Sequence, residues 1–369
     1  MSLSRVIATA WRENLLFSVL VELTYRCNLD CFFCYNDLGL KGEPLSREEY
    51  FRLFDELREM QVLNLTLTGG EPLAHPDFLL LGARARELGF VVRIKSNGHA
   101  LRGELARRVR DEVDPFLIEI SLHGATAATH DRQTRVPGSF DRLLANLHEL
   151  RELGLRVKLN STLTAWNEGE IEGMFAVADV LGLPLQVDPE VTPRDDGGRE
   201  PLQVTASREG VLRLFRLQFE RGRAVAAGAV GQVEVQVARG GDDGTLPTPV
   251  DKHCGAGSSG LAIDPYGNVY PCVQWRRPVG NLHGQGLREI WRGSAGLAEV
   301  RDLTVEVKER LGAEGAGGHL LNFCPGSAAI QAGTPFELYP AAVQRRELLE
   351  QVMAEEESGG KRTLLPIVR

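Results

Sequence analysis

The first residues of the chain lack any long uninterrupted apolar run. Charged side chains lie close to every short apolar stretch there, so the segment forms neither the apolar core of a signal peptide nor a membrane span of about 20 apolar residues. The sequence also lacks an excess of positive charge, because its formal net charge is −8 over 369 residues. An acidic balance disfavours general nucleic-acid binding. We therefore expect a cytoplasmic protein that binds neither membranes nor nucleic acid.

Cysteine is scarce, with six residues in the whole sequence. They form two groups of three, which are Cys27, Cys31 and Cys34 in the first and Cys254, Cys272 and Cys324 in the second. No cysteine is left over for a redox switch or a thiol nucleophile. An odd number in each group, in a chain without a secretion signal, argues against a disulfide framework and favours metal binding.

The first triad has the spacing C-x3-C-x2-C and directly follows an apolar, strand-like stretch. A short loop of this kind presents three thiolates from one side. They can hold three irons of a cubane [4Fe–4S] cluster and leave the fourth iron open to a small molecule. A zinc site is the alternative, but structural zinc usually has four ligands, and no fourth cysteine or histidine lies nearby. The spacing therefore favours an iron–sulfur cluster.

Strand-like and helix-like segments alternate between residues 15 and 190. The expected strands are Phe17–Leu23, Val62–Thr68, Phe90–Lys95, Phe116–Ser121, Leu155–Thr162 and Pro184–Asp188. Helices are expected between them, the first of which opens with a capping box formed by Ser46 and Glu49. Such alternation predicts parallel strands joined by right-handed crossovers. Because a closed barrel has eight such units, we expect an α/β fold with a partial (β/α)6 TIM-type barrel.

The unusual polar motifs of this region follow the ends of the expected strands. They are the cysteine loop, Gly69–Pro72, Ser96–Gly98, Ser121–Gly124, Asn160–Thr162 and Asp188–Glu190. In α/β barrels the chemistry gathers at the carboxyl ends of the strands. The sequence therefore predicts one site at one rim of the barrel.

The pattern changes after the barrel. A helix at 208–227, a strand at 233–237 and a linker at 240–249 precede a hairpin that turns at Asp264–Asn268 and brings Cys254 and Cys272 together. We divide the chain into a barrel core (1–205), a bridging helix, strand and linker (206–250), a small α+β domain (251–340), and a C-terminal helix and tail (341–369). The second triad holds a cluster or, alternatively, consists of buried structural cysteines.

The first triad and the Gly69-Gly-Glu-Pro72 turn resemble the signature of the radical S-adenosylmethionine (SAM) enzymes. The resemblance implies a [4Fe–4S] cluster whose open iron is chelated by SAM, which is cleaved to a 5′-deoxyadenosyl radical. It implies that Gly69, Gly70, Glu71 and Pro72 grip the methionine end of SAM. The glycines would let the backbone approach the ligand, and a carboxylate would accept from its ammonium group.

The same resemblance assigns further cofactor-binding residues. Phe33 would border the adenine, and Ser121 and Asn160 would bond the ribose, although polar residues at strand ends also serve as structural caps. Arg135 could face the SAM carboxylate or be an ordinary surface arginine. His123 and His130 could line the pocket, but they lack metal-ligand spacing, and Ser96 and Asn97 are expected to shape their loop.

The second triad resembles the opening of the SPASM domain, which carries auxiliary clusters. The motifs Asn281-Leu-His283 and Leu287-Arg-Glu-Ile-Trp291 look like the same family. A full SPASM domain has about seven cysteines and usually two auxiliary clusters, whereas only Cys324 remains here after Cys272. We therefore expect a single auxiliary [4Fe–4S] cluster, as in the shortened twitch relatives. Its fourth iron would be ligated by a non-cysteine residue, solvent or substrate.

These resemblances imply an oxygen-sensitive oxidoreductase that abstracts hydrogen from a C–H bond. The leading substrate is a ribosomally made peptide that is crosslinked, epimerised or dehydrogenated. The alternatives are a small molecule in cofactor, tetrapyrrole or antibiotic biosynthesis, and a non-catalytic iron–sulfur protein. We expect an electron donor of the flavodoxin or ferredoxin type. Any leader-peptide-binding module would be a separate protein, because little sequence precedes Phe17. The catalytic acid or base stays open, with Asp188, Glu190, Asp195 and Asp196 as candidates.

Overall fold

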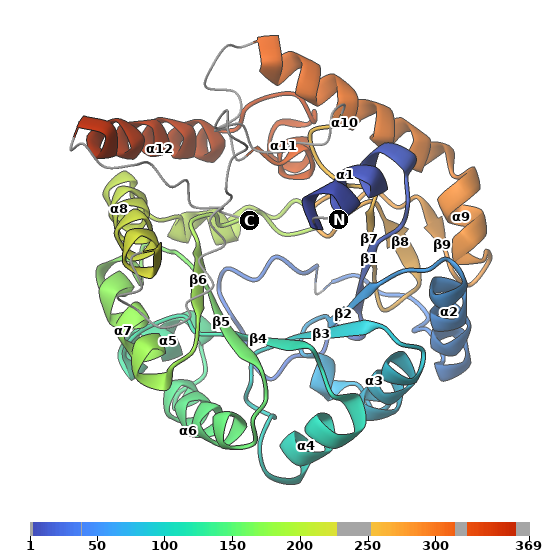
Figure 1. Ribbon diagram of the computed structural model, residues 1–369, viewed down its shortest axis with the longest axis horizontal. Helices are drawn as coiled ribbons and strands as arrows, with labels where there is room; N and C mark the ends of the chain where they lie inside the picture. Colours follow the sequence, from blue (N-terminus) through green and yellow to red (C-terminus); the bar gives the residue numbers. More distant parts are fainter. Residues whose placement is uncertain (1–2, 38, 227–251, 314–322, 359–369) are drawn as a thin grey trace.

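The computed structural model describes residues 3–37, 39–226, 252–313 and 323–358. The expected strand at 233–237 and the linker at 240–249 lie outside the described residues, as does the tail that follows residue 358. Within the described part, helices surround a curved sheet that forms an open barrel (Figure 1).

The six expected barrel strands are confirmed. They are β1 (Ser18–Glu22), β2 (Asn64–Thr68), β3 (Val91–Ser96), β4 (Leu117–Ser121), β5 (Val157–Thr162) and β6 (Leu185–Asp188). Each pairs in parallel with its sequence neighbour, which is the arrangement that strand–helix alternation predicts. The α/β fold class with a partial barrel is therefore correct.

Helices cover the outside of this sheet (Figure 1). They are α2 (Arg47–Glu59), α3 (Phe78–Glu87), α4 (Gly103–Arg108) with a π-helical turn at Val109–Val113, α5 (Ala127–Thr134), α6 (Ser139–Glu152), α7 (Ile171–Leu181) and α8 (Arg208–Ala226). The predicted capping box is present, because Ser46 Oγ accepts from Glu49 N at 3.3 Å and Glu49 Oε2 accepts from Ser46 N at 2.7 Å. The N-terminal helix α1 (Leu3–Glu13) was not predicted.

Strand periodicity separates the core from the barrel interior. Val19, Leu65, Ile94 and Ile118 are fully buried against the helices, and each such side chain contributes about 1.5–3 kcal/mol. Alternate positions turn the other way, because successive side chains of a strand point to opposite faces. In β3 the exposed residue is Lys95, which lies between buried Ile94 and Ser96. The interior of the barrel is therefore polar and charged.

The C-terminal part extends the same sheet. The predicted hairpin is formed by β7 (Gly260–Ile263) and β8 (Asn268–Tyr270), and β9 (Gly280–Asn281) follows. Buried Asp264 fixes the turn by accepting from the backbone N–H groups of Tyr266 and Asn268, each at 2.9 Å. β7 pairs in parallel with β1, from Ser18 opposite Gly260 to Val21 opposite Ile263. The described strands therefore form one nine-stranded sheet in the order β6-β5-β4-β3-β2-β1-β7-β8-β9.

Four helices complete the described structure. They are α9 (Leu287–Gly293), α10 (Ala295–Ala313), α11 (Pro325–Ala332) and α12 (Pro340–Ser358). The last confirms the predicted C-terminal helix, and it lies beside α8, to which it is linked by the ion pair between Arg216 and Glu355 at 2.8 Å (Figure 1).

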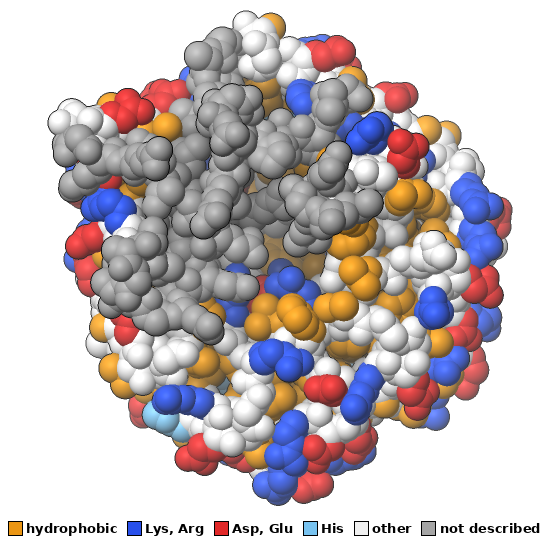
Figure 2. All heavy atoms as spheres, in the orientation of Figure 1, with side chains coloured by type: hydrophobic (Ala, Val, Ile, Leu, Met, Phe, Trp, Pro, Cys, Tyr) orange, Lys and Arg blue, Asp and Glu red, His pale blue; other side chains and the backbone are white. Residues whose placement is uncertain are grey.

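The face shown in Figure 2 carries acidic and basic side chains mixed around its rim. Large hydrophobic side chains are also exposed at Leu15, Leu63 and Phe116, each of which precedes a barrel strand. Among the described residues, no helix combines the length and apolar character needed to cross a membrane.

Candidate functional site

The first cysteine triad lies on the loop after β1, and α5 holds this loop in place. The backbone N–H groups of Asp30 and Phe32 donate to the carbonyls of Thr134 and Gln133 at 3.1 and 3.2 Å. Within the loop, Leu29 N donates to Cys27 Sγ at 3.4 Å. The sequence folds this way because α5 ends at Thr134, so its last carbonyls are free to accept from outside the helix.

Burial raises the pKa of all three thiols, and for Cys31 the neighbouring thiols Cys34 and Cys27 raise it further. The three sulfur atoms are therefore close enough to interact electrostatically. Nevertheless, no three His, Cys, Asp or Glu side chains in the described residues converge tightly enough to hold a single metal ion. None of the cysteines forms a disulfide. Three thiols presented by one loop are a donor set that fits three irons of a cubane cluster.

The two glycines after β2 let this turn pack against the cysteine loop. Gly69 has a φ of +141°, and a Cβ there would lie 2.3 Å from Thr24 O. A Cβ on Gly70 would lie 2.7 Å from Arg26 O. The Gly70 N–H donates to Thr24 O at 2.7 Å, and the Glu71 N–H donates to Arg26 O at 2.9 Å. The glycines are thus required by the contact between the two loops, which the sequence alone does not reveal.

Glu71 is 1% exposed and its carboxylate is occupied by protein donors. Oε1 accepts from Ser96 Oγ at 2.9 Å and from Leu73 N at 3.2 Å, and Oε2 accepts from Asn97 N at 2.8 Å. Burial raises the pKa of Glu71, and these hydrogen bonds act in the opposite direction. In this structure Glu71 organises the loop after β3 and lies beside Pro72, the first residue of a short 3-10 helix.

Asn97 connects this network to the cysteine loop. Its Nδ2 donates to Asn28 Oδ1 at 2.6 Å and lies 3.7 Å from Cys27 Sγ. A hydrogen bond to a cluster sulfur ligand is one of the means by which proteins tune reduction potentials. The expectation that Ser96 and Asn97 shape their loop is in keeping with these contacts, but the contact to Cys27 was missed, because sequence gives no register between the two loops.

The residues expected around the SAM nucleoside lie near the same loop. The Phe33 ring meets His123 edge-on at a centroid distance of 4.8 Å. Ser121 and Asn160 are direct partners across β4 and β5, which places both at the same barrel end. Asn160 Nδ2 donates to Glu119 Oε2 at 2.8 Å, so its amide is partly engaged by protein.

Arg135 and the two histidines are held by their surroundings. Arg135 Nη1 lies 3.2 Å from Asp30 Oδ2, and its guanidinium lies 4.7 Å from the centroid of Phe32. It therefore touches the cysteine loop. His123 and His130 are stacked and buried, and burial lowers their pKa values to about 3 and about 4. Both are neutral imidazoles at physiological pH.

The second triad is assembled from three separate segments. Cys254 and Cys272 flank the β7–β8 hairpin, and Cys324 caps α11. A Cβ on Gly326 would lie 2.4 Å from Gln274 O, so glycine at this position brings Cys324 beside the turn that follows Cys272.

The three thiols of the second triad also interact with one another. Burial, with a smaller contribution from the neighbouring thiols, raises the pKa of Cys254 to about 12 and that of Cys324 to about 11. Trp275 and Val300 pack beside Cys254 and Cys272 as a small apolar cluster. The donor set and its apolar surroundings fit an iron–sulfur cluster.

Charged side chains lie on neighbouring strands of the barrel. Glu119 accepts from Arg93 at 2.7 Å and from Asn160, whereas Lys95, its direct partner across the strands, has no hydrogen-bond or ion-pair partner among the described residues. Asp188 ends β6 with an exposed side chain, and desolvation by the surrounding protein nevertheless raises the pKa of its carboxyl. The Lys95 charge acts on both Asp188 and Cys272.

Carboxylates in loops are usually solvated, but two of those beyond β6 form ion pairs with arginines. Glu190 Oε2 lies 3.0 Å from Arg345 Nη2, and Asp195 Oδ2 lies 2.9 Å from Arg276 Nε. Asp196 is exposed and accepts from Gly198 N at 2.7 Å.

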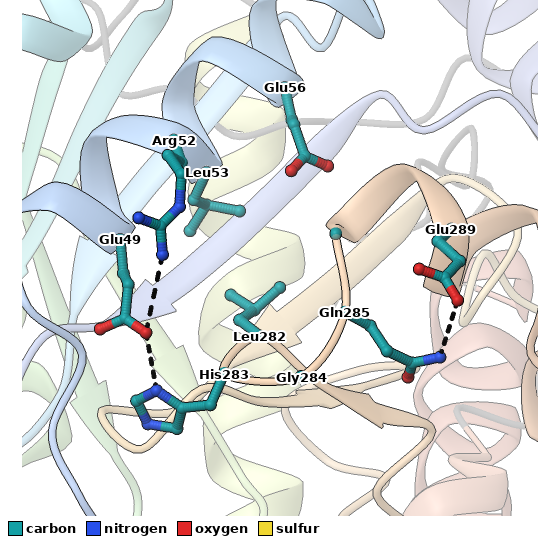
Figure 3. A pocket seen from close by; sticks show the side chains of 10 residues that line it. Glu49, Arg52, Leu53, Glu56, Leu282, His283, Gly284, Gln285 and Glu289 are labelled. Atoms are coloured by element: carbon teal, nitrogen blue, oxygen red, sulfur yellow. Dashed lines mark hydrogen bonds and ion pairs between the residues drawn. The ribbon is translucent and has the colours of Figure 1, made fainter.

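A separate cavity of about 310 Å³ lies between α2 and the segment before α9 (Figure 3). His283 Nδ1 lies 2.7 Å from Glu49 Oε1, and Gln285 Nε2 donates to Glu289 Oε1 at 3.2 Å. Neither triad contributes to its lining. The Asn281-Leu-His283 motif thus joins the C-terminal part to the capped end of α2.

A partial barrel with a three-thiol loop and a Gly-Gly turn at one rim defines a class of cluster-binding α/β barrels. Residues 21–178 match the model of the radical SAM superfamily, and residues 254–311 match that of SPASM, an iron–sulfur cluster-binding domain. The mycofactocin maturase MftC of Mycobacterium ulcerans is 32% identical over 311 residues, which cover 81% of this chain and 79% of the relative. The chain belongs to the radical SAM superfamily and carries a SPASM domain.

Two further relatives differ in what their names describe. The PqqA peptide cyclase of Ruegeria pomeroyi is 31% identical over 292 residues, 77% of this chain and 76% of the relative. The AdoMet-dependent heme synthase of Methanosarcina barkeri is 28% identical over 292 residues, 76% of this chain and 83% of the relative. The chain is accordingly a radical SAM enzyme, and its two domains imply SAM, a [4Fe–4S] cluster and auxiliary iron–sulfur binding.

Solved structures share the fold at low identity. anSMEcpe with bound AdoMet superposes with a TM-score of 0.70 at 13% identity, over 93% of this chain and 98% of that one. Streptococcus suis SuiB bound to its precursor peptide SuiA gives a TM-score of 0.63 at 14% identity, over 80% and 70% of the two chains.

Proposed function

We propose that this protein is a radical SAM maturase that modifies a ribosomally made precursor peptide by crosslinking, epimerisation or dehydrogenation. One observation carries the proposal: the first triad follows β1, and β7, which opens the hairpin flanked by Cys254 and Cys272, pairs with β1, so both triads adjoin the barrel and its interior. A substrate in that interior is within reach of a SAM-derived radical on one side and a second redox centre on the other. The similarity to the PqqA peptide cyclase favours a peptide as that substrate.

We assign the cofactor ligands as follows. Cys27, Cys31 and Cys34 hold the cluster that binds SAM, and Cys254, Cys272 and Cys324 hold one auxiliary cluster, with Phe33, Gly69–Pro72, Ser121, Asn160 and Arg135 around SAM. The bound cofactors supply one-electron cleavage of SAM and hydrogen abstraction from a C–H bond. The fourth iron of the auxiliary cluster is left for a non-cysteine residue, solvent or substrate.

The residues of the barrel interior fit a substrate with charged and amide groups. Lys95 offers an ammonium group and Asp188 a carboxylate, and neither has an ion-pair partner in the described structure. Arg93, Glu119 and Asn160 form a fixed hydrogen-bonded wall beside them. A peptide backbone in this space would meet donors and acceptors rather than an apolar surface.

The proposal includes partners and a location. A flavodoxin- or ferredoxin-type protein delivers the electron, a separate protein presents the leader of the peptide, and the enzyme acts in the cytoplasm. The net charge of −8 makes nucleic acid an unsuitable partner.

Isotope transfer tests the peptide proposal. Candidate precursor peptides deuterated at side-chain and Cα positions are incubated with anaerobically reconstituted enzyme, SAM and reductant, and 5′-deoxyadenosine is analysed by mass spectrometry. Deuterium in 5′-deoxyadenosine, absent with a Cys27→Ala variant, supports the proposal. SAM cleavage without transfer from any peptide contradicts it.

A second candidate function is radical chemistry on a small molecule in cofactor, tetrapyrrole or antibiotic biosynthesis. The 28% identity to an AdoMet-dependent heme synthase favours it. Deuterium transfer from labelled small molecules, in place of peptides, would select this alternative. A protein that binds both clusters but never cleaves SAM would instead be a non-catalytic iron–sulfur protein.

Iron and sulfide counts test the ligand assignment. The parent protein should hold about eight irons, and a Cys254/Cys272/Cys324→Ala variant about four, on cubane stoichiometry. About four irons in both proteins would make the second triad structural.

A further inference from the structure

Arg276 lies between two buried carboxylates. Its Nη2 and Nη1 donate to Glu22 Oε1 and Oε2 at 2.6 and 2.9 Å, and its Nε lies 2.9 Å from Asp195 Oδ2. The three side chains are 6%, 0% and 10% exposed. Two aromatic residues complete the group, because the Tyr25 hydroxyl donates to Glu22 Oε2 at 3.0 Å and the Tyr270 ring lies beneath the guanidinium at 5.1 Å.

The three charged residues come from three different parts of the chain. Glu22 ends β1 just before the first cysteine loop, Arg276 lies on the turn that follows Cys272, and Asp195 follows β6. The backbone N–H of Asp195 donates to the carbonyl of Tyr35 at 2.8 Å, and Tyr35 directly follows the last cysteine of the first triad. Arg276 therefore connects the segments that carry the two triads.

Stability alone gives a poor reason for this arrangement. Removing an ion from water costs several kcal/mol, and a buried ion pair is often no more stable than apolar residues of similar volume. Burial raises the pKa of Asp195 to about 7 even though Arg276 acts to lower it. The neighbouring Arg277 is different, because its pair with Glu299 is about half exposed on both sides. The turn thus carries one buried arginine, which makes a bidentate hydrogen-bonded ion pair with Glu22, and one ordinary surface arginine.

The charge of Arg276 reaches the second triad. Trp275 N donates to Cys272 O at 3.1 Å and closes the turn on which Arg276 is the next residue, so the guanidinium is carried on the same short turn as the Cys272 thiol. Reduction potentials of iron–sulfur clusters depend on local charge and hydrogen bonding. The arginine is placed to influence both position and potential.

We propose that Arg276 is a positioning residue that fixes the separation of the two cysteine triads, and that its positive charge raises the reduction potential of the auxiliary cluster. The inference rests on the proposed ligation of a cluster by the second triad, but it does not depend on which substrate the enzyme uses. Lysine cannot replace the arginine fully, since an ammonium group lacks the planar fork that contacts both oxygens of Glu22.

Three variants of the full chain, reconstituted anaerobically, test the proposal. They are Arg276→Gln, Arg276→Lys and, as the matched control, Arg277→Gln. Redox titration followed by EPR gives the midpoint potential of each cluster, and pulsed EPR gives the distribution of distances between the two reduced clusters. We expect Arg276→Gln to lower the auxiliary potential and broaden the distances. Arg276→Lys should keep the potential close to that of the parent but broaden the distances. Arg277→Gln should change neither.

An auxiliary potential and a distance distribution in Arg276→Gln equal to those in Arg277→Gln would overturn the proposal. So would a parent protein that binds only one cluster. If Arg276→Gln does not fold, Arg276→Lys decides the matter, because an unchanged distance distribution in that variant contradicts the positioning role. None of these measurements uses a peptide, so their outcome does not depend on whether the proposed substrate class is correct.

Discussion

Replacing Glu71 by glutamine should strongly destabilise the fold, although the two side chains have the same size. The buried carboxylate accepts three hydrogen bonds, from Ser96 Oγ, Leu73 N and Asn97 N. In Glu71→Gln one oxygen becomes an NH2 group, which must face one of these donors at 2.8–3.2 Å. A hydrogen bond to a charged acceptor contributes about 1.5–3 kcal/mol, and an unsatisfied buried donor costs a further amount of similar size.

We therefore expect Glu71→Gln to lower the free energy of unfolding by about 3–6 kcal/mol, the sum of these two contributions. Urea denaturation of the apoprotein, followed by circular dichroism, measures this change. Glu104→Gln is the matched control, because Glu104 is 73% exposed and pairs only with Arg107 on the helix surface. Its loss should cost less than about 1 kcal/mol.

The effect of Glu71→Gln should extend to the cofactor site. Asn97 links Glu71 to Cys27 and Asn28, so displacement of the loop after β3 also displaces the cysteine loop. Reconstituted Glu71→Gln should bind SAM more weakly than Glu104→Gln does, as measured by equilibrium dialysis. Equal stabilities for the two variants, or equal SAM affinities, would refute the role assigned here to Glu71.

Two further predictions concern the C-terminal part. Gly326→Ala places a Cβ 2.4 Å from Gln274 O, so it should displace Cys324 and lower the iron content by about four irons per chain. The control Gly312→Ala, with nothing within 4 Å of the new Cβ, should keep these irons. Full iron content in Gly326→Ala would contradict this account. The Glu43 carbonyl and Glu49 raise the pKa of His283, so its contribution to stability is complete below about pH 6.5 and is lost as the pH rises through the raised value. The pKa of Glu49 is lowered to about 2, mainly by the Ser46 backbone, so its contribution is complete above about pH 4.5 and is lost in acid. His283→Gln should therefore be least stable relative to the parent between about pH 4.5 and 6.5, where it should lose less than about 1 kcal/mol of the free energy of unfolding. Melting temperatures of the two proteins measured across this pH range check the prediction, and a difference that stays constant up to pH 10 would contradict the pairing.

The sequence predicted the barrel because its strands are short, apolar and regularly spaced, and it predicted the site because each polar motif follows a strand. It could not show how Glu71 is used, since the donors Ser96 and Asn97 belong to another loop whose register depends on the packed sheet. The link between Glu22 and Arg276 was missed for the same reason. The two residues are far apart in sequence and meet only because β7 pairs with β1.

The pairing of β1 with β7 has a consequence for biosynthesis. β1 lies between β2 and β7 in the sheet, so it obtains its second hydrogen-bonding neighbour only after residue 263 has been made. Until then β1 is an exposed edge strand, which is open to wrong pairing with other chains. The first cysteine loop directly follows that edge strand. Stable loading of its metal should therefore follow completion of the chain, and a fragment that ends at residue 226 should aggregate rather than assemble a lasting centre.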